Sequence, residues 1–114
     1  METNGVLNPD PRTARAAALR ALGDTLVAAG QPAAAIAPYQ TAVDSFPGWV
    51  SGLLALAETQ EVVGNLPAAA EAYRQAVIYN LKWHGPAADE AAALVAAGQW
   101  AGAVEKYHQI IKAK

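Results

Sequence analysis

Residues 30–39 read GQPAAAIAPY, and the same pattern returns as GNLPAAAEAY at residues 64–73 and as GQWAGAVEKY at residues 98–107. Each copy opens on a glycine, carries an alanine in its middle and closes on a tyrosine, and each of these residues recurs every 34 positions. A fixed period of this length is typical of stacked helical repeats, in which every unit buries its apolar face against its neighbours. The 34-residue period therefore predicts a stack of helical repeats, before the bounds of any single helix are assigned.

Length, charge and cysteine content limit the number of domains and the kinds of partner or site that the chain can have. The chain has 114 residues, of which 54% are hydrophobic and 16% are charged, with a formal net charge of -2. That length favours one domain over two. Acidic residues fill the middle of the chain, so no basic footprint for a nucleic-acid backbone is expected. With no cysteine in the sequence, a disulfide framework and a thiolate site are excluded.

No apolar run approaches the ~20 residues that cross a bilayer, so membrane insertion is not expected. Residues 1–10 are polar and lack the regions of a signal peptide, which makes a cytoplasmic location the default unless the chain is processed from a longer one. These residues are expected to form a flexible tail, in which Val6 and Leu7 are the hydrophobic remnant of a further repeat.

Glycine and proline mark the helix boundaries, each glycine as a helix stop and each nearby proline as a first-turn start. The expected helices cover residues 11–29, 32–45, 50–63, 65–82, 86–97 and 100–114. Because every connection between them is short, neighbouring helices should run antiparallel and form three hairpins.

The repeated residues of this chain resemble the tetratricopeptide repeat. In that repeat the first helix carries a large residue, then Leu-Gly, then an aromatic residue or Leu, and the second helix carries Ala and an aromatic residue before a closing Pro. The first unit supplies Leu19, Leu22, Gly23, Leu26, Ala35, Tyr39 and Pro47. The second has Gln60 at the aromatic position and Leu81 at the proline, and the third has Ala87 and Glu90 where large apolar residues are expected. The resembling units span about residues 16–49, 50–83 and 84–114 and weaken toward the C-terminus.

The resemblance implies an all-α fold, a right-handed α-solenoid of three antiparallel helical hairpins in a single domain over residues 11–114. Small residues are expected where the two helices of a hairpin cross, because a larger side chain would push the pair apart. These are Gly23, Ala57 and Ala91 on the first helices and Ala35, Ala69 and Ala103 on the second. The repeated tyrosines are expected in the wedge between hairpins, each hydroxyl with a polar partner.

The resemblance also implies that the first helices of the hairpins line a concave groove, which takes a peptide or helical segment of another protein. The groove residues expected from it are Arg20, Asp24, Val27, Leu54, Glu58, Glu61, Ala88, Ala92 and Val95. Arg20 and Asp24 can pair at i, i+4, so Glu58 and Glu61 supply the acidic excess. A preferred partner segment would carry apolar residues and at least one Lys or Arg; an ordinary solvated face is the alternative.

Some family members hold a terminal carboxylate on this face with a clamp of Lys, Arg and Asn. Here a lone Arg20 stands among Asp24, Glu58 and Asp89, which would repel such a ligand. Trp49 and Trp83 lie one period apart, each just before a new hairpin. They are candidate binding hot spots, with a purely structural wedge between repeats as the alternative.

No catalytic, cofactor-binding or metal-binding residue is predicted, and the chain is not expected to be an enzyme. His84 and His108 lie in different elements without acidic or cysteine partners at ligand spacing. The sequence contains no glycine-rich phosphate loop, and no Ser lies beside a candidate base.

Two function classes remain, a protein-binding adaptor and a structural element that assembles by stacking its terminal hairpins. Repeat arrays usually end in a polar cap, and the last helix has a polar side in Glu105, Lys106, Gln109 and Lys112, which favours a monomer in dilute solution. An RNA-reading repeat of similar length is disfavoured by the acidic centre.

Overall fold

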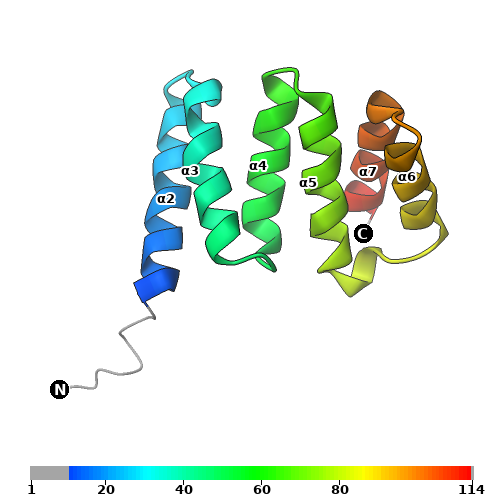
Figure 1. Ribbon diagram of the computed structural model, residues 1–114, viewed down its shortest axis with the longest axis horizontal. Helices are drawn as coiled ribbons and strands as arrows, with labels where there is room; N and C mark the ends of the chain where they lie inside the picture. Colours follow the sequence, from blue (N-terminus) through cyan, green and yellow to red (C-terminus); the bar gives the residue numbers. More distant parts are fainter. Residues whose placement is uncertain (1–10, 114) are drawn as a thin grey trace.

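The computed structural model describes residues 11–113, and over this range the chain is helical with no strand. The expected tail at residues 1–10 therefore lies outside the described residues, as does Lys114. The helices are α2 (Pro11–Ala28), α3 (Pro32–Ser45), α4 (Val50–Val62), α5 (Leu66–Ile78), the 3₁₀ helix η1 (Leu81–Trp83), α6 (Pro86–Ala96) and α7 (Trp100–Ala113). Consecutive α-helices form three hairpins set side by side (Figure 1), which confirms the predicted helical-repeat fold.

The repeated glycines close the first helix of every hairpin. Gly30, Gly64 and Gly98 have φ angles of +80°, +88° and +76°, the left-handed region that residues with a Cβ seldom adopt. Their amides bond back to carbonyls of the helix they end; that of Gly30, for example, donates to the carbonyl of Val27 at 3.0 Å. The 34-residue period is thus a period of helix ends, each set by a backbone conformation that favours glycine.

The small residues and the tyrosines of the repeat are buried in the core. Ala35, Ala69 and Ala103 are each 0% exposed, and the three repeated tyrosines are nearly as deeply buried. Close packing is clearest at Gly23, where an added Cβ would come within 2.5 Å of the Tyr39 ring. The absent side chain there makes room for the tyrosine.

The fourth helix is shorter than predicted. It was expected to reach about Lys82, but α5 ends at Ile78 and the chain turns into η1. The reason is local, because the Asn80 side chain accepts a hydrogen bond from the amide of Lys82 at 3.1 Å and caps the new turn. An Asn side chain that bonds its own backbone two residues on competes with helix continuation.

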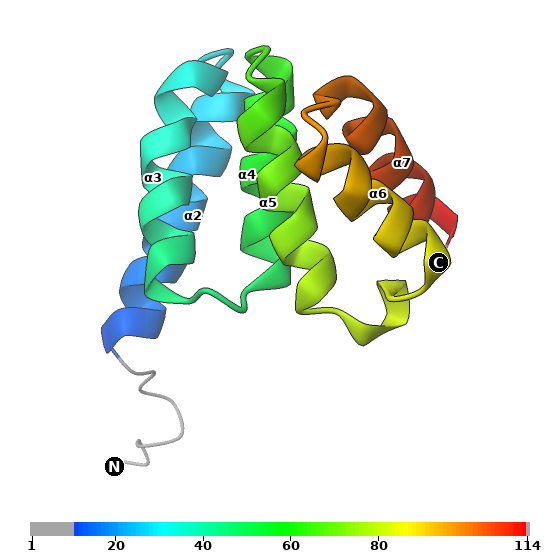
Figure 2. The same cartoon turned by 45° about the vertical axis from the view of Figure 1, so that its right-hand side comes forward.

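The third hairpin packs differently from the other two. The second hairpin meets the first through α4, but the third meets α5 more through α7 than through α6, and Figure 2 shows α6 and α7 tilted away from the direction of α5. In α6 only Ala91 is buried, while Glu90 is exposed and pairs with Lys106 at 3.0 Å. α6 has Ala87 and Glu90 at two positions where the repeat pattern expects large apolar residues, and the buried large side chains of this hairpin, Val104 and Tyr107, belong to α7.

Candidate functional site: a concave groove across α2, α4 and α7

The first half of the groove is a cleft between α2 and α4 with a volume of about 570 Å³. Its lining includes Arg20, Asp24 and Val27 from α2, and Glu58 and Val62 from α4. Four of these five were predicted from the sequence. Val62 was missed, although its 72% exposure makes it one of the most exposed large apolar residues of the described chain.

Arg20 ties the first hairpin to the second. Its Nε donates to Asp24 Oδ1 at 3.2 Å, and its Nη1 donates to Ser51 Oγ at 2.6 Å. Its guanidinium also lies 5.8 Å from the centre of the Trp49 ring, within the range of a cation–π contact. Arg20 is therefore committed to the joint between repeats, and Trp49 takes part in that joint.

Asp24 accepts a second hydrogen bond, from the Tyr39 hydroxyl. This bond, with a further contribution from Arg20, lowers the pKa of Asp24 below its ordinary value of 3.8. Burial of the phenol and the same bond raise the pKa of Tyr39 to about 12. The first repeated tyrosine thus has the polar partner that was predicted, and it holds one acid of the groove ionised.

Acid is expected to weaken the first hairpin through Asp24. A carboxylate with a lowered folded pKa stabilises the fold above its unfolded pKa, and this contribution is lost as the pH falls through the folded value. The melting temperature of the wild type should therefore fall more steeply between about pH 5 and pH 2 than that of Asp24→Asn. Circular dichroism measures both curves, and parallel curves would contradict the assignment.

The second half of the groove is a cleft of about 420 Å³ between α4, α5 and α7. Glu58 and Val62 line it as they line the first half, so the two clefts adjoin along α4. Its far wall comes from α7, with Ile111 and Lys112. A basic and an apolar side chain of the last helix thus face the acids of α4.

A polar cluster of Glu61, Tyr73 and His108 joins α4, α5 and α7 and lines this half of the groove. Glu61 Oε1 accepts from the Tyr73 hydroxyl at 2.9 Å and lies 2.8 Å from His108 Nε2. Burial is the main reason that the pKa of Tyr73 is raised, and the bond to Glu61 adds to it. The sequence did not predict this cluster, since Glu61 and His108 are 47 residues apart.

Not all predicted groove residues meet. Ala88 and Ala92 line a separate cleft of about 230 Å³ with Arg74 and Tyr107 rather than with Glu58. Leu54 and Val95 are partly buried against the core. The cause is the altered third hairpin, in which α7 rather than α6 continues the groove.

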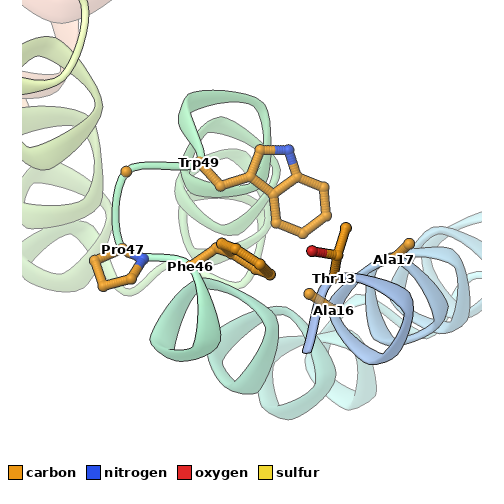
Figure 3. A pocket seen from close by; sticks show the side chains of 7 residues that line it. Thr13, Ala16, Ala17, Phe46, Pro47 and Trp49 are labelled. Atoms are coloured by element: carbon orange, nitrogen blue, oxygen red, sulfur yellow. The ribbon is translucent and has the colours of Figure 1, made fainter. Parts of the chain in front are cut away.

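The two candidate hot-spot tryptophans are half-buried and differ in surroundings. Trp83 lies in η1 and packs against the core. Trp49 borders a cleft outside the groove, together with Phe46. Of the two, Trp49 is the one that lines a cleft (Figure 3).

Two negative findings apply to residues 11–113. No group of three or more His, Cys, Asp or Glu side chains in this range is placed to hold a metal ion. None of its helices is both long and apolar enough to cross a membrane.

Comparison with known proteins agrees with the helical arrangement. A family model described as tetratricopeptide repeat matches residues 10–49 and, in an overlapping match, residues 20–80. No curated protein matches the chain. The matched region covers more than half of the sequence and includes the first two hairpins, whose packing is regular. Repeats of this kind generally mediate interactions between proteins. The chain belongs to the tetratricopeptide repeat family.

Proposed function

We propose that this domain is a protein-binding adaptor whose concave groove holds an extended or helical segment of another protein. The observation that carries the proposal is that two clefts adjoin at Glu58 and Val62 and together extend from α2 over α4 to α7. Exposed Val27 and Val62 offer apolar contact area along it, and Asp24 and Glu58 lie beside them. A mixed surface of this kind suits a segment with alternating apolar and basic side chains.

Glu58 is the acid best placed to read a basic residue of the partner. It is exposed, lines both halves of the groove, and forms no ion pair with another residue of the described range. Glu61, expected from the sequence to share this role, accepts a hydrogen bond from the Tyr73 hydroxyl and lies 2.8 Å from His108 Nε2. Glu61 is therefore proposed to position α7, and Glu58 to meet the Lys or Arg.

The groove is tested by peptides selected from a random display library on the full chain and then titrated against two variants. Val62→Arg places a bulky cation in the centre of an acidic groove and should weaken binding by at least about tenfold, since it adds a clash and a like charge. Val63→Arg, the matched control, alters a less exposed neighbour that lines neither half. Equal losses in both variants, or no selected binder, would refute groove binding.

Glu58→Gln should slow association of such a peptide by about two- to fivefold, because an exposed ion pair contributes up to ~1 kcal/mol. It should also flatten the salt dependence of the association rate, since rim charges mainly steer encounter. Stopped-flow anisotropy at several salt concentrations measures both. Glu105→Gln, an exposed acid of α7 outside the groove, is the control. An unchanged salt slope in Glu58→Gln would assign the basic residue to another acid.

If the domain is an adaptor, we expect it to be a monomer in dilute solution. Light scattering over a range of micromolar concentrations checks this directly. A stable dimer there would favour the assembly function instead.

A further inference from the structure

Another cleft of the domain uses a different set of α4 residues from the groove. Its volume is about 330 Å³, and none of its lining residues lines either half of the groove. Leu53, Leu56 and Gln60 line it from α4, at the spacing of one helix face. Its other walls come mainly from α3 and α5, between which α4 lies (Figure 1). We call it the glutamine cleft, since Gln40, Gln60 and Gln75 all line it.

Gln60 is the unusual residue of the glutamine cleft. It is only 8% exposed, yet within residues 11–113 no group donates to its side-chain amide or accepts from it. A buried amide without a hydrogen-bond partner destabilises a fold, so each such group calls for an explanation. The fold does not require an amide here, because the corresponding residues of the other two repeats, 34 positions away, are Leu26 and Leu94. The donors and the acceptor of the Gln60 amide are therefore available to a ligand in the cleft.

The walls of the glutamine cleft add acceptors and negative charge. Asp44 is exposed and forms no ion pair with another residue of the described range, and Gln40 Nε2 donates to its Oδ1 at 2.9 Å. On the α5 wall, Gln75 Nε2 donates to Glu71 Oε2 at 3.1 Å. Because both amide nitrogens are turned toward carboxylates, the carbonyl oxygens of Gln40 and Gln75 remain as acceptors. Among the described residues, no Lys, Arg or His lines the cleft.

We propose that the glutamine cleft binds the guanidinium group of an arginine side chain from a partner protein. Guanidinium is a cation with five N–H donors and no acceptor, which suits a site of carboxylate and amide oxygens. Asp44 would supply the opposite charge, because Glu71 is already paired with Arg74 at 2.7 Å. Gln60 Oε1 would accept a hydrogen bond deeper in the cleft, and the apolar side chain of Leu56 would pack on the aliphatic stem of the arginine.

The size of the glutamine cleft favours one long side chain over a cofactor. Its volume is near the lower limit of the range of about 300–1,000 Å³ found for pockets that hold drug-sized ligands. Repeats of this family generally mediate interactions between proteins, which favours a protein as the source of the arginine. This site goes beyond the adaptor groove, and because the two share no lining residue, each can be tested without the other.

NMR titration of the ¹⁵N-labelled full chain with two peptides tests the proposal. The probes are acetyl-GARAG-amide and the same peptide with citrulline, a neutral residue of nearly the same shape, in place of arginine. The arginine peptide is expected to shift the side-chain amide resonance of Gln60. It should also bind at least about threefold more tightly than the citrulline peptide, because only arginine carries a charge that Asp44 can pair with.

Gln60→Leu should weaken binding of the arginine peptide by about fivefold or more, followed through the backbone amides of the cleft, because it removes the amide. It should also raise the melting temperature by a few degrees, since it removes an unpartnered polar group from a buried position. Gln109→Leu is the matched control, the same change at an exposed position of α7 outside the cleft.

Two further variants separate charge from location. Asp44→Asn should weaken binding of the arginine peptide by about two- to fivefold and leave the citrulline peptide unchanged, because it removes the charge and keeps the shape. Glu58→Gln, in the groove, should change the affinity for neither peptide.

Five results would overturn binding of arginine in the glutamine cleft. Equal affinity for the two peptides would remove the role of the charge, and unchanged binding by Gln60→Leu would place the site elsewhere. A lower melting temperature of Gln60→Leu would mean that the amide is satisfied within the fold. No shift of the Gln60 resonance with either peptide would leave the cleft to water alone. Tighter binding of ethylguanidine than of the arginine peptide would assign the cleft to a small, free guanidinium compound.

Discussion

Tyr73→Ala is expected to lower the free energy of unfolding by about 3–5 kcal/mol, the usual cost of truncating a buried aromatic side chain. Tyr73 is 2% exposed, and its ring stacks on Tyr107 with centroids 6.1 Å apart and meets His108 edge-on at 5.5 Å. Its hydroxyl donates a hydrogen bond to Glu61. The substitution therefore removes the ring that joins the second hairpin to the third, along with one bond of the polar cluster.

Urea unfolding followed by circular dichroism measures this loss, and amide hydrogen exchange locates it. Exchange should rise most in α7, because α7 makes the larger part of the contact between the third hairpin and α5. Tyr73→Phe keeps the ring and removes only the hydroxyl. It should lower the free energy of unfolding by about 0.5–1.5 kcal/mol, the net value of one hydrogen bond. If the alanine variant were no less stable than the phenylalanine variant, the ring would not be the link between hairpins.

The features that could be predicted from the sequence are those with a strict local cause. Gly30, Gly64 and Gly98 each adopt a positive φ, so the backbone itself requires their residue type. The absence of a side chain at Gly23 is dictated by the ring of Tyr39, which comes from the adjoining helix of the same hairpin. Within one hairpin, sequence spacing and spatial contact agree, and the predictions of burial were correct.

The features that could not be predicted arise between hairpins. Helical periodicity identifies the apolar side of a helix, but not which neighbour that side will meet. The weak signal was present in Ala87 and Glu90, which leave α6 with little apolar surface to bury. The sequence did not indicate that α7 would take over the contact and bring His108 to Glu61. As a result most of the residues expected from α2 and α4 line the two adjoining clefts, whereas Ala88 and Ala92 of α6 line a separate one.

Ala69→Leu is expected to lower the free energy of unfolding by about 1–3 kcal/mol, because inserted methylene groups strain a well-packed core. Ala69 is 0% exposed in α5 and belongs to the continuous core of the domain. In an α-helix, Leu and Ala have similar intrinsic propensities, so the loss reports on packing and not on helix formation. Thermal and urea unfolding both measure it.

The neighbouring Ala68→Leu is the matched control that separates packing from every other effect of the change. Ala68 lies one residue earlier in the same helix but lines an open cleft of about 330 Å³, where a longer side chain has room. Ala68→Leu should therefore lower the free energy of unfolding less than Ala69→Leu does. Its added side chain can also bury apolar area, which stabilises the fold by about 25 cal/mol per Å². Equal losses would mean that the alanine repeated every 34 residues is not a limit on how closely α4 and α5 approach. A large difference would identify that alanine as the residue that sets the spacing within the hairpin, and with it the width of the groove floor formed by α4.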